Sequence, residues 1–394
     1  MDALSIIIPA YNEEDAIEGV LKSCLAAREP LCRQAGFSWV EIIAVNDGSR
    51  DRTRELIGRF SEVKLQSHPV NKGYGAALMT GFQAARGDFL AFLDADGTCD
   101  PLAIAELHRV LKAQGADLCI GNRLHPQSRM PKIRELGNRF YAQLISQLSG
   151  VTVSDTASGM RLFKRDLLPI LYSLPAGLHF TPAMTARAVC MGAKISETPI
   201  PYSARQGQSK LNVIIDGVRF LRVILSIIFA YYPLKIFGPL GILFGFIALV
   251  YGAGPVSYYL EHRRLEEDMI YRLLTILTLT VCGLITLAFG LVAQKAAQIS
   301  LRRSSGWLDK PWVGIGAVAL GFAFGLWGVL LNSKTILEYV SSGRITIHWI
   351  YVLSGGLAVI SGTVLACFGI TLGLVGHLQP MEQNRFAGVT KRNN

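Results

Sequence analysis

The sequence predicts an α/β domain built on a mostly parallel sheet, followed by one helix at the membrane surface and by four transmembrane helices. In the first part of the 394-residue chain, short apolar runs alternate with helical stretches, which is the pattern of a parallel sheet with helices on both faces. The charge is also divided unequally, since residues 1–232 carry 26 of the 39 Lys and Arg and 22 of the 29 Asp and Glu. We therefore expect a globular part at 1–212, an interface helix at 213–232 and a transmembrane part at 233–394.

Three apolar runs in the first part have the length of buried strands, and each ends in polar residues. They are Leu4–Ile8, Val40–Val45 and Asp88–Leu93, and the residues that follow them are rich in Asn, Asp and Glu. In an open parallel sheet, ligands collect at the carboxyl ends of the strands. We therefore expect the three polar clusters to form one binding site.

The cluster after the third run has the spacing of a cation site. Asp94 and Asp96 are two residues apart, so on an extended backbone both carboxylates point the same way and can face one hard cation. Glu13 and Asp47 add two acidic groups at the same edge. Such a cluster would repel itself unless it met a metal, a hydroxyl donor or an exocyclic amine. An exposed turn rich in Asp and Gly is the alternative interpretation.

Residues 213–232 read VIIDGVRFLRVILSIIFAYY, in which three charged residues are spaced by three along one side of a helix. These residues are Asp216, Arg219 and Arg222. A charged stripe on an otherwise apolar helix is typical of a segment that lies in the headgroup plane of a membrane. A fifth membrane crossing is the competing interpretation, although the three charges shorten its apolar span.

Four stretches of the second part lack Asp, Glu, Lys and Arg over the roughly 20 residues that a helix needs to cross a bilayer. A soluble helical bundle would need polar faces on its outer helices, and runs such as GPLGILFGFIALV have none. The sequence therefore predicts four membrane helices. They cover Ile236–Leu260, Leu273–Gln294, Pro311–Ser333 and Trp349–Gly376.

The charges beside these stretches predict the orientation of the chain. The loop at residues 295–310 carries four basic residues against one acidic residue, and the C-terminal tail carries three against one, whereas the two other loops are nearly balanced. Cytoplasmic loops carry the excess of Lys and Arg. We therefore expect the N-terminal domain, this loop and the tail to face the cytoplasm, and the absence of a signal-peptide pattern at the N-terminus agrees.

Five motifs in the first part resemble those of the inverting nucleotide-sugar glycosyltransferases of family two. In chain order they are IIIPAYNEE (6–14), VNDGSRDRT (45–53), NKGYGAALMTGF (71–82), LDADGT (93–98) and DTASGMRLFKR (155–165). More narrowly, DTASGMR together with RQGQSKLN (205–212) and the membrane helices resembles the polyprenyl-phosphate glycosyltransferases, the dolichol-phosphate mannose synthase group. The resemblance covers residues 4–212 and implies a nucleotide-binding domain of the GT-A type.

The resemblance also implies a donor site with a divalent metal, Mg²⁺ or Mn²⁺. Asp94 and Asp96 would hold this ion against the donor pyrophosphate, where it neutralises charge on the leaving nucleoside diphosphate. Many relatives have Gln two residues after the second Asp, whereas here Thr98 takes this place and is a third candidate ligand. The implied nucleotide-sugar-binding residues are Pro9, Tyr11, Glu13, Val45, Asp47, Lys72, Asp94 and Ala95.

The acceptor side follows from the charge of a lipid phosphate, which is largely a dianion at neutral pH because its second pKa is about 6. The need for a general base is therefore small, and the larger need is for cations that hold two anions together. The candidate cations are Arg123, Arg134, Arg161, Arg205 and Lys210, with Ser158 as a hydroxyl donor. The expected catalytic residues are Asp96 and Asp155; the resemblance implies that Asp155 is the base, and orienting the phosphate or Lys210 is its alternative role.

These residues favour a transferase that moves a hexose from a UDP-glucose or GDP-mannose type donor to undecaprenyl or dolichyl phosphate, with inversion. The side chains of Asp47 and Glu13 suit either nucleobase, uracil or guanine. One alternative is a family two enzyme that acts on another membrane lipid or on a polysaccharide, although the Q-x-x-R-W signature of processive synthases is absent. A non-catalytic membrane scaffold is the other. The charge pattern argues against a nucleic-acid partner, and the glycines of Gly321–Gly328 permit close packing between protomers.

Overall fold

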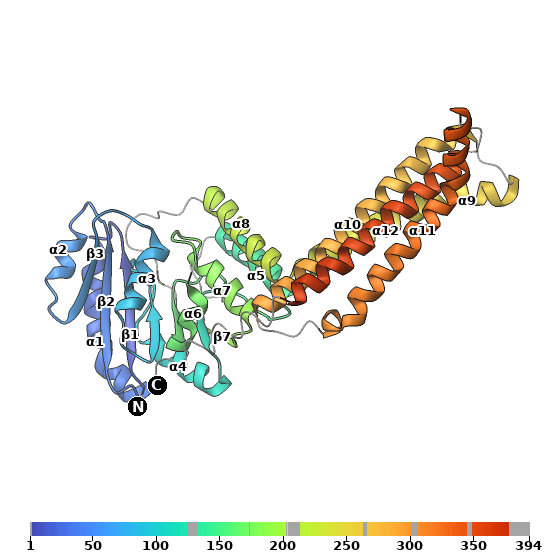
Figure 1. The fold of residues 1–394 in the computed structure, drawn as a ribbon. Helices are drawn as coiled ribbons and strands as arrows, with labels where there is room; N and C mark the ends of the chain where they lie inside the picture. Colours follow the sequence, from blue (N-terminus) through green and yellow to red (C-terminus); the bar gives the residue numbers. More distant parts are fainter. Residues whose placement is uncertain are drawn as a thin grey trace. The chain divides into compact units, whose positions relative to one another are not determined.

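The computed structural model describes residues 2–124, 132–172, 174–201, 203, 213–262, 266–301, 306–344 and 349–377. Its contacts divide the chain into two compact units, Met1–Ile228 and Phe229–Asn394. The first unit is a sheet covered by helices, and the second consists of long helices (Figure 1).

The first unit is built on a seven-stranded mixed sheet with the strand order β3-β2-β1-β4-β6-β5-β7. β6 runs antiparallel to its neighbours β4 and β5, and the other strand pairs are parallel. The three predicted strand runs are β1, β2 and β4, so the predicted α/β fold with a mostly parallel sheet is confirmed. The strands are β1 (Leu4–Ala10), β2 (Val40–Asp47), β3 (Val63–His68), β4 (Phe89–Phe92), β5 (Leu118–Asn122), β6 (Arg161–Lys164) and β7 (Ile195–Pro199).

Helices cover both faces of this sheet (Figure 1). Ile6 and Ile8 of β1 belong to the apolar core that also contains buried residues of α1 and α4. Ile7 points to the other face and packs beneath α3, where Gly81 provides the room for its side chain. β1 is therefore apolar at consecutive positions because both of its faces are buried. The helices of this unit are α1 (Ile17–Ala35), α2 (Thr53–Gly58), α3 (Tyr74–Ala84), α4 (Ala103–Gln114), α5 (Lys132–Ser149), α6 (Leu168–Leu171), α7 (Phe180–Met191) and α8 (Val213–Tyr231).

α8 covers the segment for which an interface helix is predicted, and it packs on α5. The hydroxyl of Tyr141 in α5 donates a hydrogen bond to the carbonyl oxygen of Gly217 at 2.7 Å, and the rings of Tyr141 and Phe220 lie 6.1 Å apart edge to face. Of the predicted charged stripe, Arg219 and Arg222 are exposed, but Asp216 is buried. The stripe therefore does not lie on one solvent-facing side, because Asp216 turns into the first unit.

The second unit contains four helices that are long and apolar enough to cross a membrane, judged by length and composition among the described residues. They confirm the four predicted stretches, and each is longer than the stretch predicted for it. The count of charge-free residues stops at the first charged side chain, whereas the helices continue through flanking charges such as Lys235 and Glu338. Their bounds are α9 (Pro233–His262), α10 (Ile270–Ser300), α11 (Pro311–Ser342) and α12 (Trp349–His377).

Glycines allow α11 and α12 to approach closely. A Cβ added at Gly321 would lie 2.5 Å from the carbonyl oxygen of Gly362, and one added at Gly328 would lie 2.5 Å from that of Gly355. Gly369 approaches the carbonyl oxygen of Gly314 in the same way. The glycines on each helix are spaced by seven residues, so they face one another along a single seam. The sequence indicated that the glycines of Gly321–Gly328 permit close packing between protomers; within one chain, Gly321 and Gly328 face α12.

Candidate active site

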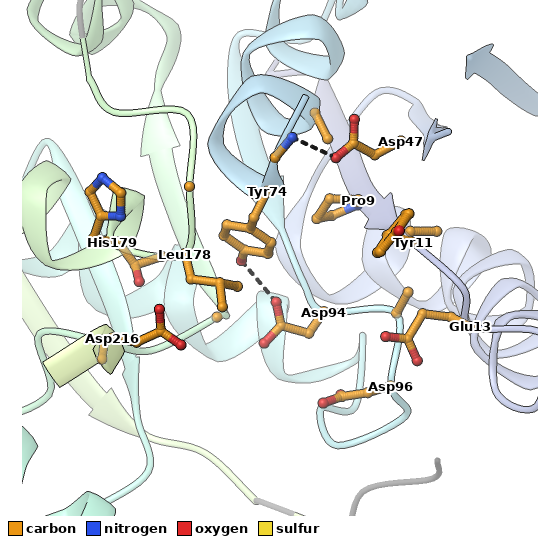
Figure 2. A pocket seen from close by; sticks show the side chains of 18 of the residues that line it. Pro9, Tyr11, Glu13, Asp47, Tyr74, Asp94, Asp96, Leu178, His179 and Asp216 are labelled. Carbon is orange, nitrogen blue, oxygen red and sulfur yellow. Dashed lines mark hydrogen bonds between the residues drawn. The ribbon is translucent and has the colours of Figure 1, made fainter. Parts of the chain in front are cut away.

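A pocket of about 450 Å³ opens at the carboxyl ends of β1, β2 and β4. Figure 2 shows Tyr11, Glu13 and Asp47 on one side of it and His179 and Asp216 on the other, with the remaining labelled side chains between them. The three predicted polar clusters therefore do meet at one edge of the sheet. The lining residues are Pro9, Ala10, Tyr11, Glu13, Asp47, Asn71, Gly73, Tyr74, Ala77, Asp94, Ala95, Asp96, Arg123, Ala157, Gly159, Gly177, Leu178, His179, Thr181, Asp216, Arg219 and Phe220.

The loop after β1 is held by bonds to the loop after β2. Asn12 has a positive φ of 50°, and its side-chain oxygen accepts a hydrogen bond from the backbone N–H of Arg50 at 2.8 Å. The backbone N–H groups of Asn12 and Glu13 donate to the hydroxyls of Ser49 and Thr53, at 3.0 and 2.8 Å. Tyr11 and Glu13 are thereby set at the mouth of the pocket before any ligand arrives.

The carboxylate of Asp47 fixes the segment that leads into α3. It accepts hydrogen bonds from the backbone N–H groups of Lys72 and Gly73, at 2.9 and 2.8 Å, and lies 2.7 Å from Nδ1 of His68. Gly73 has a φ of 103°, and a Cβ there would lie 2.5 Å from the carbonyl oxygen of Ala176. Lys72 was predicted as a donor-site residue. Its backbone N–H takes part in this network, but its side chain does not line the pocket.

The carboxylates of Asp94 and Asp96 both line the pocket, and each is oriented by a hydroxyl group. Tyr74 donates to Oδ1 of Asp94 at 2.8 Å, which is drawn in Figure 2. Thr98 donates to Oδ1 of Asp96 from its hydroxyl at 2.6 Å and from its backbone N–H at 3.1 Å. Thr98 is buried, so its hydroxyl supports Asp96 and does not face the pocket as the predicted third ligand would.

The backbone of Gly159, in the segment Ser158–Met160, lies directly against the side chain of Asp94. A Cβ added at Gly159 would overlap Oδ2 and Cγ of Asp94 and would lie 2.7 Å from Oδ1. The carboxylate of Asp94 is therefore confined between the hydroxyl of Tyr74 and the backbone of Gly159. Burial and the negative charge of Asp94 raise the pKa of Tyr74, so this hydroxyl keeps its proton and remains a donor.

These residues fit a divalent ion of the magnesium type. Among the described residues no group of three or more His, Cys, Asp or Glu side chains gathers as a ready ligand set. Mg²⁺ commonly binds through only one or two carboxylates and completes its shell with water and substrate phosphates. The pair Asp94 and Asp96 at the edge of an open pocket matches that pattern.

Asp155 is placed differently from the expectation that it acts as a base in the pocket. It is fully buried and absent from the pocket lining, and its carboxylate accepts hydrogen bonds from Nε and Nη2 of Arg123 at 2.8 and 2.9 Å. Asn138 donates to it at 2.6 Å. Burial opposes its ionisation, but the charge and the hydrogen bonds of Arg123 outweigh burial and hold the pKa of Asp155 below its usual value. Arg123 does line the pocket, so Asp155 holds a pocket cation in place.

Arg161 and Ser158 are also placed differently from the expectation that they bind the acceptor phosphate. Both are fully buried and absent from the pocket lining. The guanidinium of Arg161 donates to the carbonyl oxygens of Ser158 and Thr156, at 3.1 and 2.6 Å, and to the hydroxyl of Thr185 at 2.9 Å. Ser158 donates to the carbonyl oxygen of Gly121 at 2.6 Å. Burial lowers the pKa of Arg161 to about 10, and the two residues hold the turn at 155–161 together.

Of the other predicted residues, Pro9 and Ala95 line the pocket, whereas Val45 is buried within β2 and does not. Arg134 lies in α5, and its side chain is outside the described part of the structure. Arg205 and Lys210 lie outside the described residues as well. Several lining residues were not predicted from the sequence, although the segment Gly73–Gly75 and the charged stripe were visible signals for Tyr74, Asp216 and Arg219. The unpredicted lining residues include Tyr74, Gly159, His179, Asp216, Arg219 and Phe220.

Comparison with known proteins gives consistent matches in the first unit. The sequence profile described as glycosyl transferase family 2 matches residues 5–170. A "Dolichyl-phosphate hexose transferase" of Haloferax volcanii is 31% identical over 228 residues, which are 57% of this chain and 94% of that protein. The "Low-salt glycan biosynthesis hexosyltransferase Agl6" of the same organism is 32% identical over 56% of this chain, and the match spans about half, 53%, of its length.

Among solved structures, glucosyl-3-phosphoglycerate synthase from Mycobacterium tuberculosis, in complex with Mn²⁺, uridine diphosphate and phosphoglyceric acid, matches with a TM-score of 0.47. The two chains are 23% identical, and the match covers 58% of this chain and 78% of the other.

Proposed function

Because this chain belongs to glycosyl transferase family 2, we propose that it transfers a hexose from a nucleotide sugar to a polyprenyl phosphate, with inversion at the anomeric carbon. One observation carries this proposal. Four carboxylates, those of Glu13, Asp47, Asp94 and Asp96, line the same pocket as the guanidinium of Arg123. A donor with a metal-bound diphosphate suits the acidic side, and an anionic acceptor suits the cationic side. The polyprenyl acceptor is supported by the dolichyl-phosphate hexose transferase among the relatives.

The donor nucleoside is proposed to bind between Tyr11, Glu13 and Asp47. The ring of Tyr11 offers a stacking surface, and the carboxylate of Glu13 accepts hydrogen bonds from ribose hydroxyls. The carboxylate of Asp47 receives three donors within the protein, whereas an ionised carboxylate has about four acceptor positions. One position therefore remains for an N–H of the base, and both uracil and guanine supply one. Donors of the UDP-glucose and GDP-mannose type remain equally suitable.

Asp94 and Asp96 are proposed to hold Mg²⁺ or Mn²⁺ at the donor diphosphate. When bound, the ion neutralises charge that develops on the leaving nucleoside diphosphate. The protein fixes the two carboxylates in advance through Tyr74 and Thr98, so little reorganisation is needed when the donor binds.

The acceptor phosphate is proposed to attack without help from a strong base. Its oxygen forms a bond to the anomeric carbon on the face opposite the diphosphate, the bond from that carbon to the diphosphate oxygen breaks, and the nucleoside diphosphate leaves. A lipid phosphate is already ionised near neutral pH, so no proton has to be removed. Arg123 is proposed to hold this anion, and Asp155 to keep Arg123 in position. Arg134, Arg205 and Lys210 remain proposed further cations.

The helices α9 to α12 are proposed to anchor the enzyme in a membrane with the first unit in the cytoplasm. The excess of Lys and Arg in the 295–310 loop and in the C-terminal tail supports this orientation. α8 is proposed to lie at the membrane surface, as its apolar composition with few charges suggests.

The proposal is tested by incubating the full chain in detergent with Mg²⁺ or Mn²⁺, a radiolabelled UDP- or GDP-hexose and a polyprenyl phosphate. We expect the label to enter the organic phase with undecaprenyl or dolichyl phosphate and not with diacylglycerol or a soluble oligosaccharide. Asp96→Ala should abolish the transfer, whereas Asp166→Ala, which changes an exposed carboxylate, should leave it intact. Full turnover by Asp96→Ala would show that the metal and donor site is elsewhere.

A further inference from the structure

The first turns of α8 form part of the pocket wall. Asp216, Arg219 and Phe220 all line it, and their spacing of three and four residues places them on one face of the helix. The sequence predicted that this helix lies in the headgroup plane of a membrane. The structure gives it a second role, because the same helix brings charged groups to the site of group transfer.

Specific contacts fix this part of α8 against the first unit. The bond from the Tyr141 hydroxyl to the carbonyl of Gly217 and the contact of the Tyr141 and Phe220 rings join α8 to α5. A Cβ at Gly217 would lie 3.2 Å from the Tyr141 hydroxyl, so a glycine leaves this approach unhindered. Phe220 is itself buried. The position of Arg219 beside the pocket therefore depends on a defined helix-to-helix contact.

The α8 side of the pocket differs in charge from the donor side. The carboxylates of Glu13, Asp47, Asp94 and Asp96 line the donor side, whereas the α8 side has the guanidinium of Arg219 and the imidazole of His179 together with one carboxylate, that of Asp216. Figure 2 shows His179 and Asp216 on the same side of the pocket. Asp216 lies 3.1 Å from Nη1 of Arg219 and so steadies one end of the guanidinium. The Arg219 side chain is 62% exposed, which leaves its other donors accessible to a ligand.

We propose that Arg219, steadied by Asp216, and the neighbouring His179 complete, together with Arg123, the subsite for the phosphate group of the lipid acceptor, so that α8 presents this group to the donor sugar. The inference rests on the proposed function and assigns acceptor recognition within the same pocket. An arginine fork matches two phosphate oxygens, and the imidazole adds one further donor. Burial and the nearby charge of Arg219 lower the pKa of His179, which keeps the ring neutral at physiological pH and able to donate one hydrogen bond.

The test compares Arg219→Gln with Arg222→Gln, which removes an exposed arginine one turn further along α8 and outside the pocket lining. Steady-state kinetics of the full chain would be measured with a nucleotide sugar and a polyprenyl phosphate. We expect the KM for the polyprenyl phosphate to rise about 10- to 100-fold in Arg219→Gln, as for the loss of a charged hydrogen bond, with the KM for the donor unchanged. Arg219→Lys keeps the positive charge but not the forked geometry of the guanidinium, so its KM for the polyprenyl phosphate should lie between those of the wild type and Arg219→Gln. The acceptor KM of Arg222→Gln should match that of the wild type.

Equal acceptor KM values for Arg219→Gln and Arg222→Gln would overturn the inference, as would a donor KM that rises in step with the acceptor KM. A binding measurement separates this failure from failure of the proposed function. If no nucleotide sugar supports turnover by the wild type, the proposed function fails. Binding of farnesyl phosphate, with farnesol as the control, then still reports on the subsite: loss of binding in Arg219→Gln alone supports it, and equal binding by both variants refutes it.

Discussion

Replacement of Gly159 by Ala should disable the site without removing any functional group. The added Cβ would overlap Oδ2 and Cγ of Asp94 and lie 2.7 Å from Oδ1. Ordinary van der Waals contact begins at 3.4 Å, so even the farthest of these three atoms must retreat by about 0.7 Å, the difference between the two distances, and Oδ2 must retreat further. A shift of this size also breaks the hydrogen bond of 2.8 Å from Tyr74 to Asp94.

The expected effect on turnover follows from this displacement. A misplacement of about 1 Å at a reacting centre lowers the rate about 100-fold, so Gly159→Ala should lose about two orders of magnitude in kcat/KM. The strain in the closely packed turn should lower the stability of the fold by about 1–3 kcal/mol. Turnover would be measured as transfer of labelled hexose to polyprenyl phosphate, and Mn²⁺ affinity by titration of the purified protein.

Gly19→Ala is the matched control, since an added Cβ at Gly19 in α1 meets no atom within 4 Å. This variant should keep wild-type turnover and Mn²⁺ affinity. A Gly159→Ala variant that kept its circular dichroism spectrum and a turnover within about threefold of the wild type would contradict this expectation, because Asp94 would then tolerate a displacement that metal binding should not.

Three further predictions concern other contacts. Asp155→Asn leaves the partly buried guanidinium of Arg123 without its counter-charge and should cost about 3 kcal/mol near neutral pH. Because the folded pKa of Asp155 is depressed, its stabilisation is present above 3.8 and lost as the pH falls through the folded value, so the unfolding midpoints of the two proteins should converge in acid. Tyr74→Phe removes a donor from a charged acceptor and should raise the Mn²⁺ concentration needed for half-maximal turnover about 10-fold, and an unchanged Mn²⁺ requirement would contradict the role given to Tyr74. Gly321→Val should destabilise the helical unit by about 1–3 kcal/mol in thermal unfolding, whereas Gly316→Val, where no atom lies within 4 Å, should not.

The strands and the acidic side of the pocket were readable from the sequence because both follow from local rules. Buried parallel strands are apolar at consecutive positions, and the residues after them meet at one sheet edge. Asp94 and Asp96 both line the pocket as predicted, but Asp96 lies in a turn after β4 and not on the extended backbone from which their pairing was predicted.

The basic residues of the pocket were predicted less accurately, because the charge of a residue does not tell which way its side chain points. Arg161 begins β6, where it is enclosed by carbonyl oxygens from the turn before it, so its charge serves the fold. The pairing of Asp155 with Arg123 joins residues 32 positions apart, and their spacing in the sequence gives no sign of this contact. Asp216 and Arg219 were visible as a stripe, but only the packing of α8 on Tyr141 shows that the stripe reaches the pocket.

The glycine seam between α11 and α12 has a mechanical consequence. At Gly321, Gly328 and Gly369 the helices meet backbone to backbone, so at these points no side-chain rotamer can change to accommodate a sliding motion. Close approach of this kind also favours weak Cα–H···O contacts, which form only at short range. Sliding of one helix along the other is therefore opposed by backbone contacts at these three points. Any relative motion of helices within this unit should be smallest along the glycine seam.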